Sequence, residues 1–386
     1  INDKDIERFF TDVRKRIPLP PRKFPLIDRQ EVLKIFRYGA QWACNRYQID
    51  PSILQSAENH GCVMDSDEGD FPYNTVIPDR LIDIACSIFC HIGGGNHFLE
   101  MQYVDKIIDK PLCNSLGITP GQITIMYHSG SGYFGSMMGR FYAHRTKNTL
   151  RGHLELFPKK LLFHLAHLSK ETSLMERIKF YLLCKQFVFL PADSVEGQRA
   201  ILSLKASTNY AYANRLSIFN QIGLSLQKIG CLSPQELSIF WDHSHNSISR
   251  ENYDGTFFWM HRHNTCKISP INELPIDSMF KSTGQPTFIP GFNTTSSFIC
   301  VADENCGASL NSIDHGAGKN IEKFIERGIS KKYPDRETMI FNYKDAKPFL
   351  KKQYSDEGIE TVIDKLNKNR VVKPIARLRP LAALKG

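Results

Sequence analysis

The sequence HIGGGNHFLE spans residues 91–100, and ITIMYHSGS spans residues 123–131. In both segments a short apolar run lies beside glycines and a histidine, a pattern that predicts a strand with a polar side chain at its end. The same texture of short apolar runs and Gly-rich turns extends over residues 81–133. We therefore predict strands here, with His97 and His128 at strand ends, where their rings can point into a pocket.

The rest of the chain divides by its hydrophobic spacing. Residues 1–16, 29–50 and most of 142–230 have helical spacing, and Asp193 or Ser194 is a candidate cap after a break at residues 190–194. Strand and turn texture returns over residues 240–320, followed by a helix at about 356–368 and an extended C-terminal run. We find no internal repeat or linker. The sequence therefore predicts one intertwined α+β domain over residues 1–386, with a helical lobe at about 145–235.

Composition narrows the class of protein. Lys and Arg total 49 against 40 for Asp and Glu, and the resulting net charge of +9 suits an anionic partner such as nucleic acid, although a generally basic protein gives the same balance. The 10 cysteines show no disulfide spacing and indicate reduced thiols in an intracellular, cytoplasmic protein. The longest apolar runs, such as residues 180–184 and 187–192, are shorter than the roughly 20 residues that span a bilayer, so no membrane association is expected.

Histidines carry the most chemical information in this sequence. His97, His128 and His245 each lie beside Gly, Ser or Asn, and neutral imidazole is the most common metal-ligand side chain. His315 precedes Gly316, Ala317 and Gly318, and such small residues allow a phosphate to approach backbone N–H groups. A single histidine is more often a hydrogen-bonded core residue, and Gly-Ala-Gly also occurs in simple turns, so the residues alone leave both interpretations open.

Taken in order, these segments resemble the RtcB family of tRNA-splicing RNA ligases. The matching motifs run through the whole chain and lie at residues 93–100, 128–131, 190–199, 209–215, 245–246, 261–262, 290–297, 315–318 and 376–386. The resemblance implies strands around a metal and nucleotide cleft. It also implies that His97, His128 and His245 are manganese (Mn²⁺) ligands.

Further roles follow from the same resemblance. His315 corresponds to the histidine that attacks GTP and carries GMP as a covalent intermediate. The nucleotide-binding positions implied are Asn96, Glu100, Ser297, Gly316, Ala317, Gly318, Tyr354 and Lys385. The implied substrates are GTP, an RNA with a 3′-phosphate or 2′,3′-cyclic phosphate, and an RNA with a 5′-hydroxyl, in tRNA splicing or RNA repair. An activating protein partner is also conceivable, since some members of the family need one.

The sequence departs from the family in two respects. The family's Asp-x-x-Cys metal motif would lie upstream of Ile1, so we expect it to be absent from this chain; Cys86 and Cys90 are a weak substitute and are better explained as buried thiols. Several cationic or polar positions also differ: the chain has Gly132, His263, Phe292, Lys319 and Lys323 where the family has Arg, Lys, Ser, Arg and Arg. Arg and Lys are not interchangeable where a planar guanidinium grips a phosphate.

These departures leave three functions open. The first is an RNA ligase that uses GTP and manganese. The second is a catalytically weak pseudo-ligase that binds RNA ends, and the third is a guanylyltransferase that caps 3′-phosphates without efficient joining. Retention of His315 and the three ligand-type histidines favours the first, and loss of the arginines favours the other two.

Overall fold

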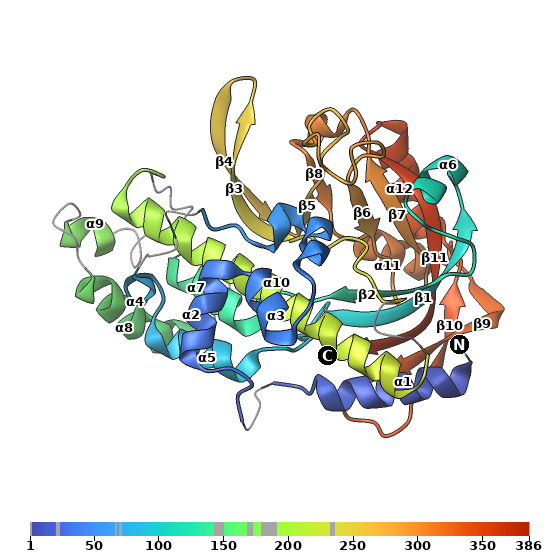
Figure 1. The fold of residues 1–386 in the computed structure, drawn as a ribbon, viewed down its shortest axis with the longest axis horizontal. Helices are drawn as coiled ribbons and strands as arrows, with labels where there is room; N and C mark the ends of the chain where they lie inside the picture. Colours follow the sequence, from blue (N-terminus) through green and yellow to red (C-terminus); the bar gives the residue numbers. More distant parts are fainter. Residues whose placement is uncertain are drawn as a thin grey trace.

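The computed structural model describes residues 2–20, 24–65, 68, 72–142, 150–167, 173–178, 191–231 and 236–385. Helices gather at one end of the molecule and a mainly antiparallel sheet at the other, and the long helix α10 (Val195–Lys228) runs between them (Figure 1). The predicted α+β class is confirmed. Most of the predicted break at residues 190–194 is described, whereas the apolar run at 180–184 and most of the run at 187–192 lie outside the described residues.

Local signals explain where the helices begin and end. Asn2 and Asp28 form capping boxes at the starts of their helices. The Ser194 hydroxyl accepts a hydrogen bond from the Gly197 N–H at 3.0 Å, so Ser194 is the N-cap of α10, as the sequence predicted. Gly39 has φ of +52° and separates two helices in the predicted 29–50 helix. The other helices are α1 (Asp3–Arg16), α2 (Arg29–Tyr38), α3 (Ala40–Tyr47), η1 (Pro51–Ser56), η2 (Glu58–Gly61), α4 (Tyr73–Val76), α5 (Asp79–Ile88), α6 (Lys110–Ser115), α7 (Gly132–Tyr142), α8 (Leu150–Ala166), α9 (Leu174–Ile178), η6 (Cys306–Ser309), α11 (Gly318–Glu326) and α12 (Glu357–Lys368).

The principal sheet has the strand order β10-β9-β11-β1-β2, with β7 joined to β11 and β6 joined to β7. A separate β3–β4 hairpin and a short β5–β8 pair complete the strands. The strand prediction for residues 81–88 was wrong, because apolar residues at helical spacing bury one side of α5. The strands are β1 (Phe98–Ile107), β2 (Ile123–His128), β3 (Asn246–Tyr253), β4 (Thr256–His263), β5 (Thr265–Lys267), β6 (Pro286–Ile289), β7 (Ser297–Ala302), β8 (Ser312–Asp314), β9 (Lys332–Phe341), β10 (Phe349–Tyr354) and β11 (Val372–Lys385).

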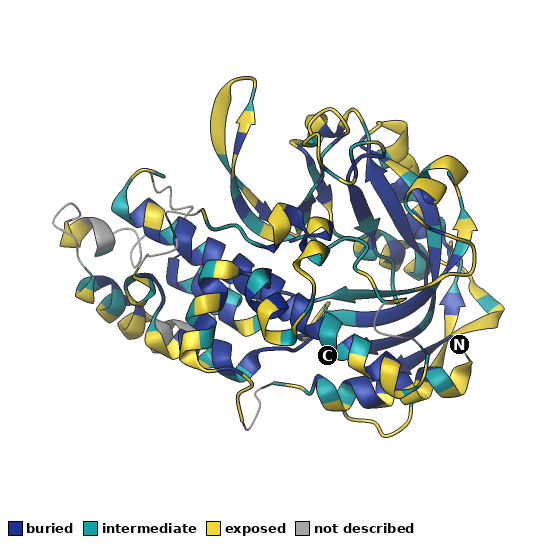
Figure 2. Ribbon diagram, in the orientation of Figure 1, coloured by how far each residue is buried: buried dark blue, intermediate teal, exposed yellow. Residues whose placement is uncertain are grey.

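The long helix α10 is the centre of the largest apolar core. It packs against α1, α2, α3 and α7, and most of its middle is buried, as the dark ribbon in Figure 2 shows. A second core lies between α11, α12 and the strands β7 and β8. None of the described helices has the length and apolar character that crossing a membrane requires.

A buried ion pair joins the C-terminal strand β11 to the start of α12. The guanidinium of Arg379 lies 2.8 Å from Asp356, and both residues are buried. Asp356 also accepts hydrogen bonds from the backbone N–H and hydroxyl of Ser296, both at 2.9 Å. Asp105 also lies 3.4 Å from Arg379, but Asp356 is its closer partner, and breaking a buried pair is far more costly than breaking a surface pair.

We therefore expect Asp356→Ala to lower the free energy of unfolding by about 3–5 kcal/mol, as measured by chemical denaturation. Glu304→Ala is the matched control, because Glu304 pairs with Arg370 where both side chains are mostly exposed. The control should lose about 0–1 kcal/mol. Equal losses in the two variants would contradict the special weight given to the buried pair.

Candidate active site

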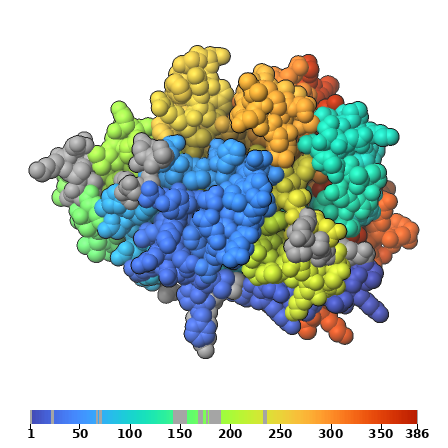
Figure 3. Space-filling view, in the orientation of Figure 1, coloured from blue at the N-terminus to red at the C-terminus, as the bar shows by residue number. Residues whose placement is uncertain are grey.

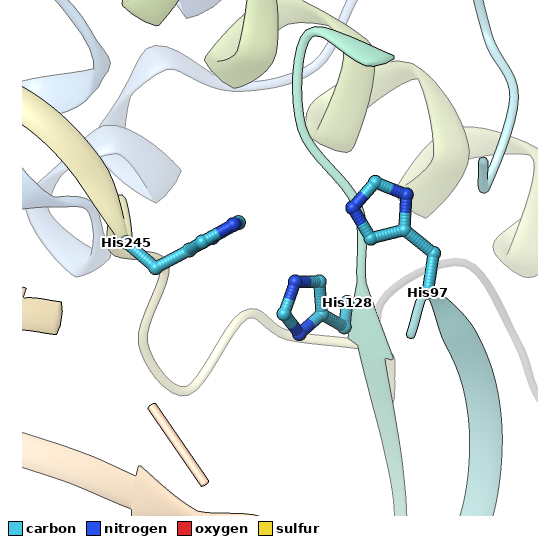
Figure 4. A group of neighbouring side chains, drawn as sticks. All are labelled: His97, His128 and His245. Atoms are coloured by element: carbon cyan, nitrogen blue, oxygen red, sulfur yellow. The ribbon is translucent and has the colours of Figure 1, made fainter. Parts of the chain in front are cut away.

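Three histidines from different parts of the chain meet at one point. His97 lies directly before β1, His128 ends β2 and His245 directly precedes β3. Each offers one ring nitrogen, and these nitrogens all lie within 4.8 Å of one another. Figure 4 shows the three rings pointing toward a common space. Among the described residues, no other group of three His, Cys, Asp or Glu side chains is arranged to hold a metal ion.

Backbone glycine allows the His97 ring to take its place. Gly93 has φ of +109°, and a Cβ atom there would lie 2.0 Å from His97 Nδ1. Any other residue would therefore displace the ring or strain the chain. Of the Gly93–Gly95 triplet, the first glycine is thus required by close contact, whereas a Cβ at Gly94 would meet open space.

The helix α10 fixes the loop after His128. The amide nitrogen of Asn214 donates to the carbonyl oxygens of His91 and Gly130 and to the hydroxyl of Ser129, at 3.0–3.1 Å. The neighbouring Arg215 binds the carboxylate of Asp242. Buried polar groups with this many partners are rigid. The two loops that carry His97 and His128 are therefore tied to the same point on α10.

The segment that carries His245 is fixed in a similar way. The buried Glu58 carboxylate accepts a hydrogen bond from the Ser244 N–H at 2.9 Å. On the other side, the Thr265 N–H donates to the His245 carbonyl at 3.1 Å. Burial raises the pKa of Glu58, and the hydrogen bond from Ser244 opposes that rise. Glu58 and Thr265 thus hold the backbone at Ser244 and His245 in place.

Burial keeps the clustered imidazoles neutral. Burial, reinforced by the neighbouring histidines, lowers the pKa of His128 to about 3 and that of His245 to about 2. The pKa of His97 is also lowered, mainly by burial. His97 Nδ1 and His128 Nε2 are buried with no hydrogen-bond partner in the structure. Neutral rings with unshared nitrogen lone pairs are the form in which histidine binds metal.

His315 stands beside this cluster. Its ring is stacked on that of His245 with centroids 5.0 Å apart, and its centroid is 5.2 Å from that of His128. Nδ1 lies 2.8 Å from the Asn264 carbonyl oxygen, which accepts hydrogen bonds only, so Nδ1 carries the proton. Nε2 is then the unprotonated nitrogen, and it faces the Asn96 amide at 3.5 Å. The geometry leaves Nε2 available as a nucleophile.

The loop after His315 packs on the loop before β7. The Ala317 N–H donates to the Pro290 carbonyl at 3.2 Å, and a Cβ at Gly316 would lie 3.6 Å from the same oxygen. A Cβ at Gly318 would lie 3.1 Å from the Phe292 ring. The helix α11 begins at Gly318 without a side-chain cap, so its first N–H groups point toward this loop junction.

The predicted nucleoside-binding residues fall on the strands behind this junction. The Gln102 amide donates to both the Glu100 carboxyl and the Ser297 hydroxyl, the latter at 3.1 Å. Burial raises the pKa of Glu100 to about 8, against the attraction of Lys385. Tyr354 joins the same region through its backbone N–H, which donates to the Thr294 carbonyl at 2.7 Å.

A cavity of about 790 Å³ opens beside the histidines. Its wall includes His128, His245 and His315, all six residues of β2 and the segment 236–243. Glu100, Ser297, Tyr354 and Lys385 are not part of that wall. The structure therefore brings the four histidines and Asn96 together, while Glu100, Ser297, Tyr354 and Lys385 lie outside the wall of this cavity.

The whole chain, residues 1–386, matches a family model described as tRNA-splicing ligase RtcB. The chain belongs to the RtcB family. Its relatives include tRNA-splicing ligase RtcB of Methanococcus maripaludis, 23% identical over 99% of this chain and 76% of the relative, and that of Archaeoglobus fulgidus, 28% identical over 93% and 71%. The Pyrococcus abyssi relative is 26% identical over 90% of this chain, which spans only 36% of that relative's length.

The structure shows the surroundings of the residues at which the sequence analysis expects a departure from the RtcB pattern. Gly132 has φ of +56°, and a Cβ there would lie 2.6 Å from the His91 ring, so an arginine does not fit this backbone. Phe292 fills space against Gly318. His263, Lys319 and Lys323 are exposed or partly exposed, with room to meet a ligand.

The paired cysteines are core residues in this RtcB member. Cys86 and Cys90 are both buried in the main apolar core, and burial raises the pKa of Cys86 to about 11. Neither belongs to the histidine group. The prediction of buried thiols is confirmed, and among the described cysteines none forms a disulfide.

Sequence reasoning missed the residues that hold the site from behind. Asn264 fixes the His315 tautomer through its backbone carbonyl. Every residue has such a carbonyl, so the side chain at position 264 gives no indication of this role. Glu58 and Gln102 lie in segments without a catalytic motif. Asn214 and Arg215 were visible as a motif, but their partners became clear only in the folded structure.

Glu100 gives this region a pH dependence. The folded protein holds its proton up to about pH 8, whereas the unfolded chain loses it near 4.5, so wild-type stability should fall as pH rises across that interval. Glu100→Gln should become progressively more stable than wild type over this range, by on the order of 1 kcal/mol per pH unit, and level off above it. Thermal melts at several pH values test this, with the exposed Glu304→Gln as control. A pH-independent difference would refute the assignment.

Proposed function

We propose that this chain is the catalytic domain of an RNA ligase that seals RNA ends through a GMP–histidine intermediate. The arrangement of His315 is the observation that carries the proposal. Its Nε2 lacks a proton, faces Asn96 and adjoins the three clustered histidines. We take residues 1–386 as one ligase unit, with residues at about 145–235 as its helical lobe. The activity of the full-length relatives is extended to this chain only as part of the proposal.

The histidine cluster supports a transition-metal site. His97, His128 and His245 each offer one ring nitrogen, all within 4.8 Å of one another, and such a site suits manganese. When bound, the metal supplies positive charge that offsets the charge of the triphosphate. The protein's contribution is the rigid support of the three rings by Gly93, Asn214 and Glu58 described above.

In the first step His315 Nε2 attacks the α-phosphorus of GTP, an N–P bond forms and pyrophosphate leaves. Asn264 keeps the proton on Nδ1, so the ring attacks without first losing a proton from Nε2. Asn96 is placed to hydrogen-bond an oxygen of the phosphate being transferred. The Ala317 N–H is taken by the Pro290 carbonyl, and we assign the N–H groups of Gly316 and Gly318 to the remaining phosphate oxygens.

In the next steps the RNA 3′-phosphate takes GMP from His315, forming a phosphoanhydride. The 5′-hydroxyl of the second RNA then attacks the 3′-phosphorus, a phosphodiester forms and GMP leaves. A 2′,3′-cyclic phosphate must first be opened by water to give the 3′-phosphate. Lys319 and Lys323 are point charges for these phosphates where the family has the bidentate guanidinium of arginine.

We assign recognition of guanine to the strand residues behind the loop. The Glu100 carboxyl group holds its proton below about pH 8 in the ligand-free protein. The carbonyl oxygen of the protonated group accepts a hydrogen bond from a donor on the edge of guanine, which adenine lacks in this arrangement. Ser297 and Lys385 lie beside it, and Tyr354 offers a ring for stacking. This assignment selects GTP over ATP.

The guanylyltransferase without efficient joining is kept as a second candidate, because one specific observation favours it. Gly132 replaces a cation on a backbone that has no room for arginine, while His315 and its support are complete. RNA joining would suffer from that loss more than GMP transfer. A need for an activating protein partner and a role in tRNA splicing are part of the ligase proposal.

The first test is incubation with α-labelled GTP and manganese, followed by a denaturing gel. Wild type should form an acid-labile covalent label, and His315→Ala should lose it entirely, because the accepting nitrogen is gone. His60→Asn is the control, since His60 is exposed on η2 with a left-handed backbone that Asn tolerates. An undiminished label in His315→Ala would overturn the assignment of the nucleophile.

The metal assignment is tested by binding alone. Titration calorimetry with Mn²⁺ should give at least a tenfold weaker dissociation constant for His128→Ala than for wild type, because one of three ligands is removed. His167→Ala should bind like wild type, since that ring hydrogen-bonds the Phe163 carbonyl elsewhere. Unchanged Mn²⁺ affinity in His128→Ala would exclude the cluster as the metal site.

A further inference from the structure

The β3–β4 hairpin projects from the body of the molecule (Figure 1). In the space-filling view it forms a ridge of its own, and its strands are mostly exposed (Figures 2 and 3). His245 immediately precedes β3, and Asn264, which holds His315, immediately follows β4. The base of the hairpin is therefore built from residues of the site, whereas its tip reaches into solvent.

One face of the hairpin is attached to the body. Arg262 on this face forms a buried ion pair with Glu251, at 2.9 Å, and also binds the Leu310 carbonyl. Tyr253 binds the same carbonyl at 3.0 Å, and its ring lies 6.4 Å from that of Phe258. These contacts fix the hairpin in its projecting position.

The opposite face carries a row of rings. Because side chains alternate along a strand, this face of β4 presents Phe257, Trp259, His261 and His263. Phe257 is 58% exposed, and both histidines are exposed. The row runs from the exposed tip to His263, which adjoins Asn264. We call these four residues the aromatic row.

Two rings of the aromatic row lie close to cations, one of which is itself surrounded by carboxylates. The β3 residues on the same face, paired with the row, are Asn246, Ile248, Arg250 and Asn252, so the hairpin adds no carboxylate there. The Arg250 guanidinium lies 4.5 Å from the centre of the Phe257 ring. Lys205 of α10, which is itself paired with Asp65 and Glu68, lies 6.0 Å from the Trp259 ring.

The spacing of the row suits separated bases. Alternate residues of a strand lie about 6.6 Å apart, roughly twice the 3.4 Å step between stacked bases in one strand of a duplex. Rings at this spacing match the bases of an extended single strand, each stacked on protein instead of on its neighbour. Proteins that hold single strands without sequence preference combine such rings with nearby cations.

We propose that the aromatic row is a stacking track for single-stranded RNA, holding the nucleotides that precede the 3′-phosphate and leading that end to His315. The inference rests on the proposed function for the identity of the bound end. It adds a binding surface on the hairpin, outside the cluster and its loops. It also gives the chain a way of holding RNA that does not depend on the cation missing at Gly132.

The experiment measures binding of a fluorescent, single-stranded RNA of about eight nucleotides with a 3′-phosphate by anisotropy. Phe257→Ala should raise the dissociation constant between about fivefold and about a hundredfold, the range expected for one lost base–ring stack. Phe257→Tyr should bind like wild type, because stacking is retained. Phe258→Ala is the matched control: Phe258 is the next residue of the same strand, is 50% exposed, and lies on the opposite face.

A second measurement follows the ring itself. The chain has three tryptophans, at 42, 241 and 259, and stacking of a base on Trp259 should quench fluorescence when RNA binds. Trp259→Phe should lose the quenching while keeping most of the affinity. Two observations together would overturn the track. Phe257→Ala and Trp259→Phe would bind RNA as tightly as wild type does, and Trp259→Phe would still show the quenching. An equal loss of affinity in Phe258→Ala would also overturn the track.

Two further outcomes are distinguishable. If the variants change the sedimentation mass of the protein but not its RNA affinity, the aromatic row is an interface between copies of the chain, and the proposal is wrong. The GMP label on His315 needs no RNA, so it separates the two proposals. A label with RNA binding insensitive to the row would refute the track alone, whereas row-dependent RNA binding without any label would refute the ligase chemistry alone.

Discussion

The site depends on the hydrogen bonds that Asn214 makes from the buried middle of α10. One amide group binds the backbone around His91 and around Ser129–Gly130, so the loops before β1 and after β2 are held at a fixed separation. His97 and His128 extend from these loops. Because a polar group this deeply buried is costly to leave unpaired, any shift of either loop would strand donors in an apolar surrounding. The positions of the rings therefore follow from the packing of a helix that carries no catalytic group.

The same burial sets the chemistry of the rings. Histidines in water are partly protonated near neutral pH, and several protonated rings this close would repel one another. Burial and mutual proximity lower the pKa values of His128 and His245 far enough that they stay neutral. This neutral state is the one that the proposed chemistry needs, because a neutral imidazole nitrogen can bind a metal or act as a nucleophile, whereas imidazolium can do neither. His315 shares the neighbourhood but gains its orientation from the single carbonyl of Asn264.

Much of the fold and of the site could be predicted from the sequence, and the features that could not be predicted have identifiable physical causes. Alternating or continuous apolar runs beside Gly and His located β1 and β2, and Ser194 located the start of α10, because these signals are local. The helix at residues 79–88 was missed because a short apolar run does not distinguish a buried helix from a strand. The histidines stood out by their Gly, Ser and Asn neighbours, and the family motifs implied their individual roles. Glu58, Gln102 and Asn264 were not found, because their roles come from partners distant in the chain or from backbone atoms.

Gly132 shows how a departure from the family pattern becomes part of a fold. Its left-handed backbone begins α7 against the buried ring of His91, whose own backbone binds Asn214. Restoring arginine there would press a side chain into the group that positions His97 and His128. The glycine at this position is thus coupled to the support of the histidines, and the backbone excludes the arginine that the resemblance implies for the family. In the proposed stacking track, RNA is held instead by the β3–β4 hairpin, where Phe257 is 58% exposed and the opposite face is fixed to the body through Arg262.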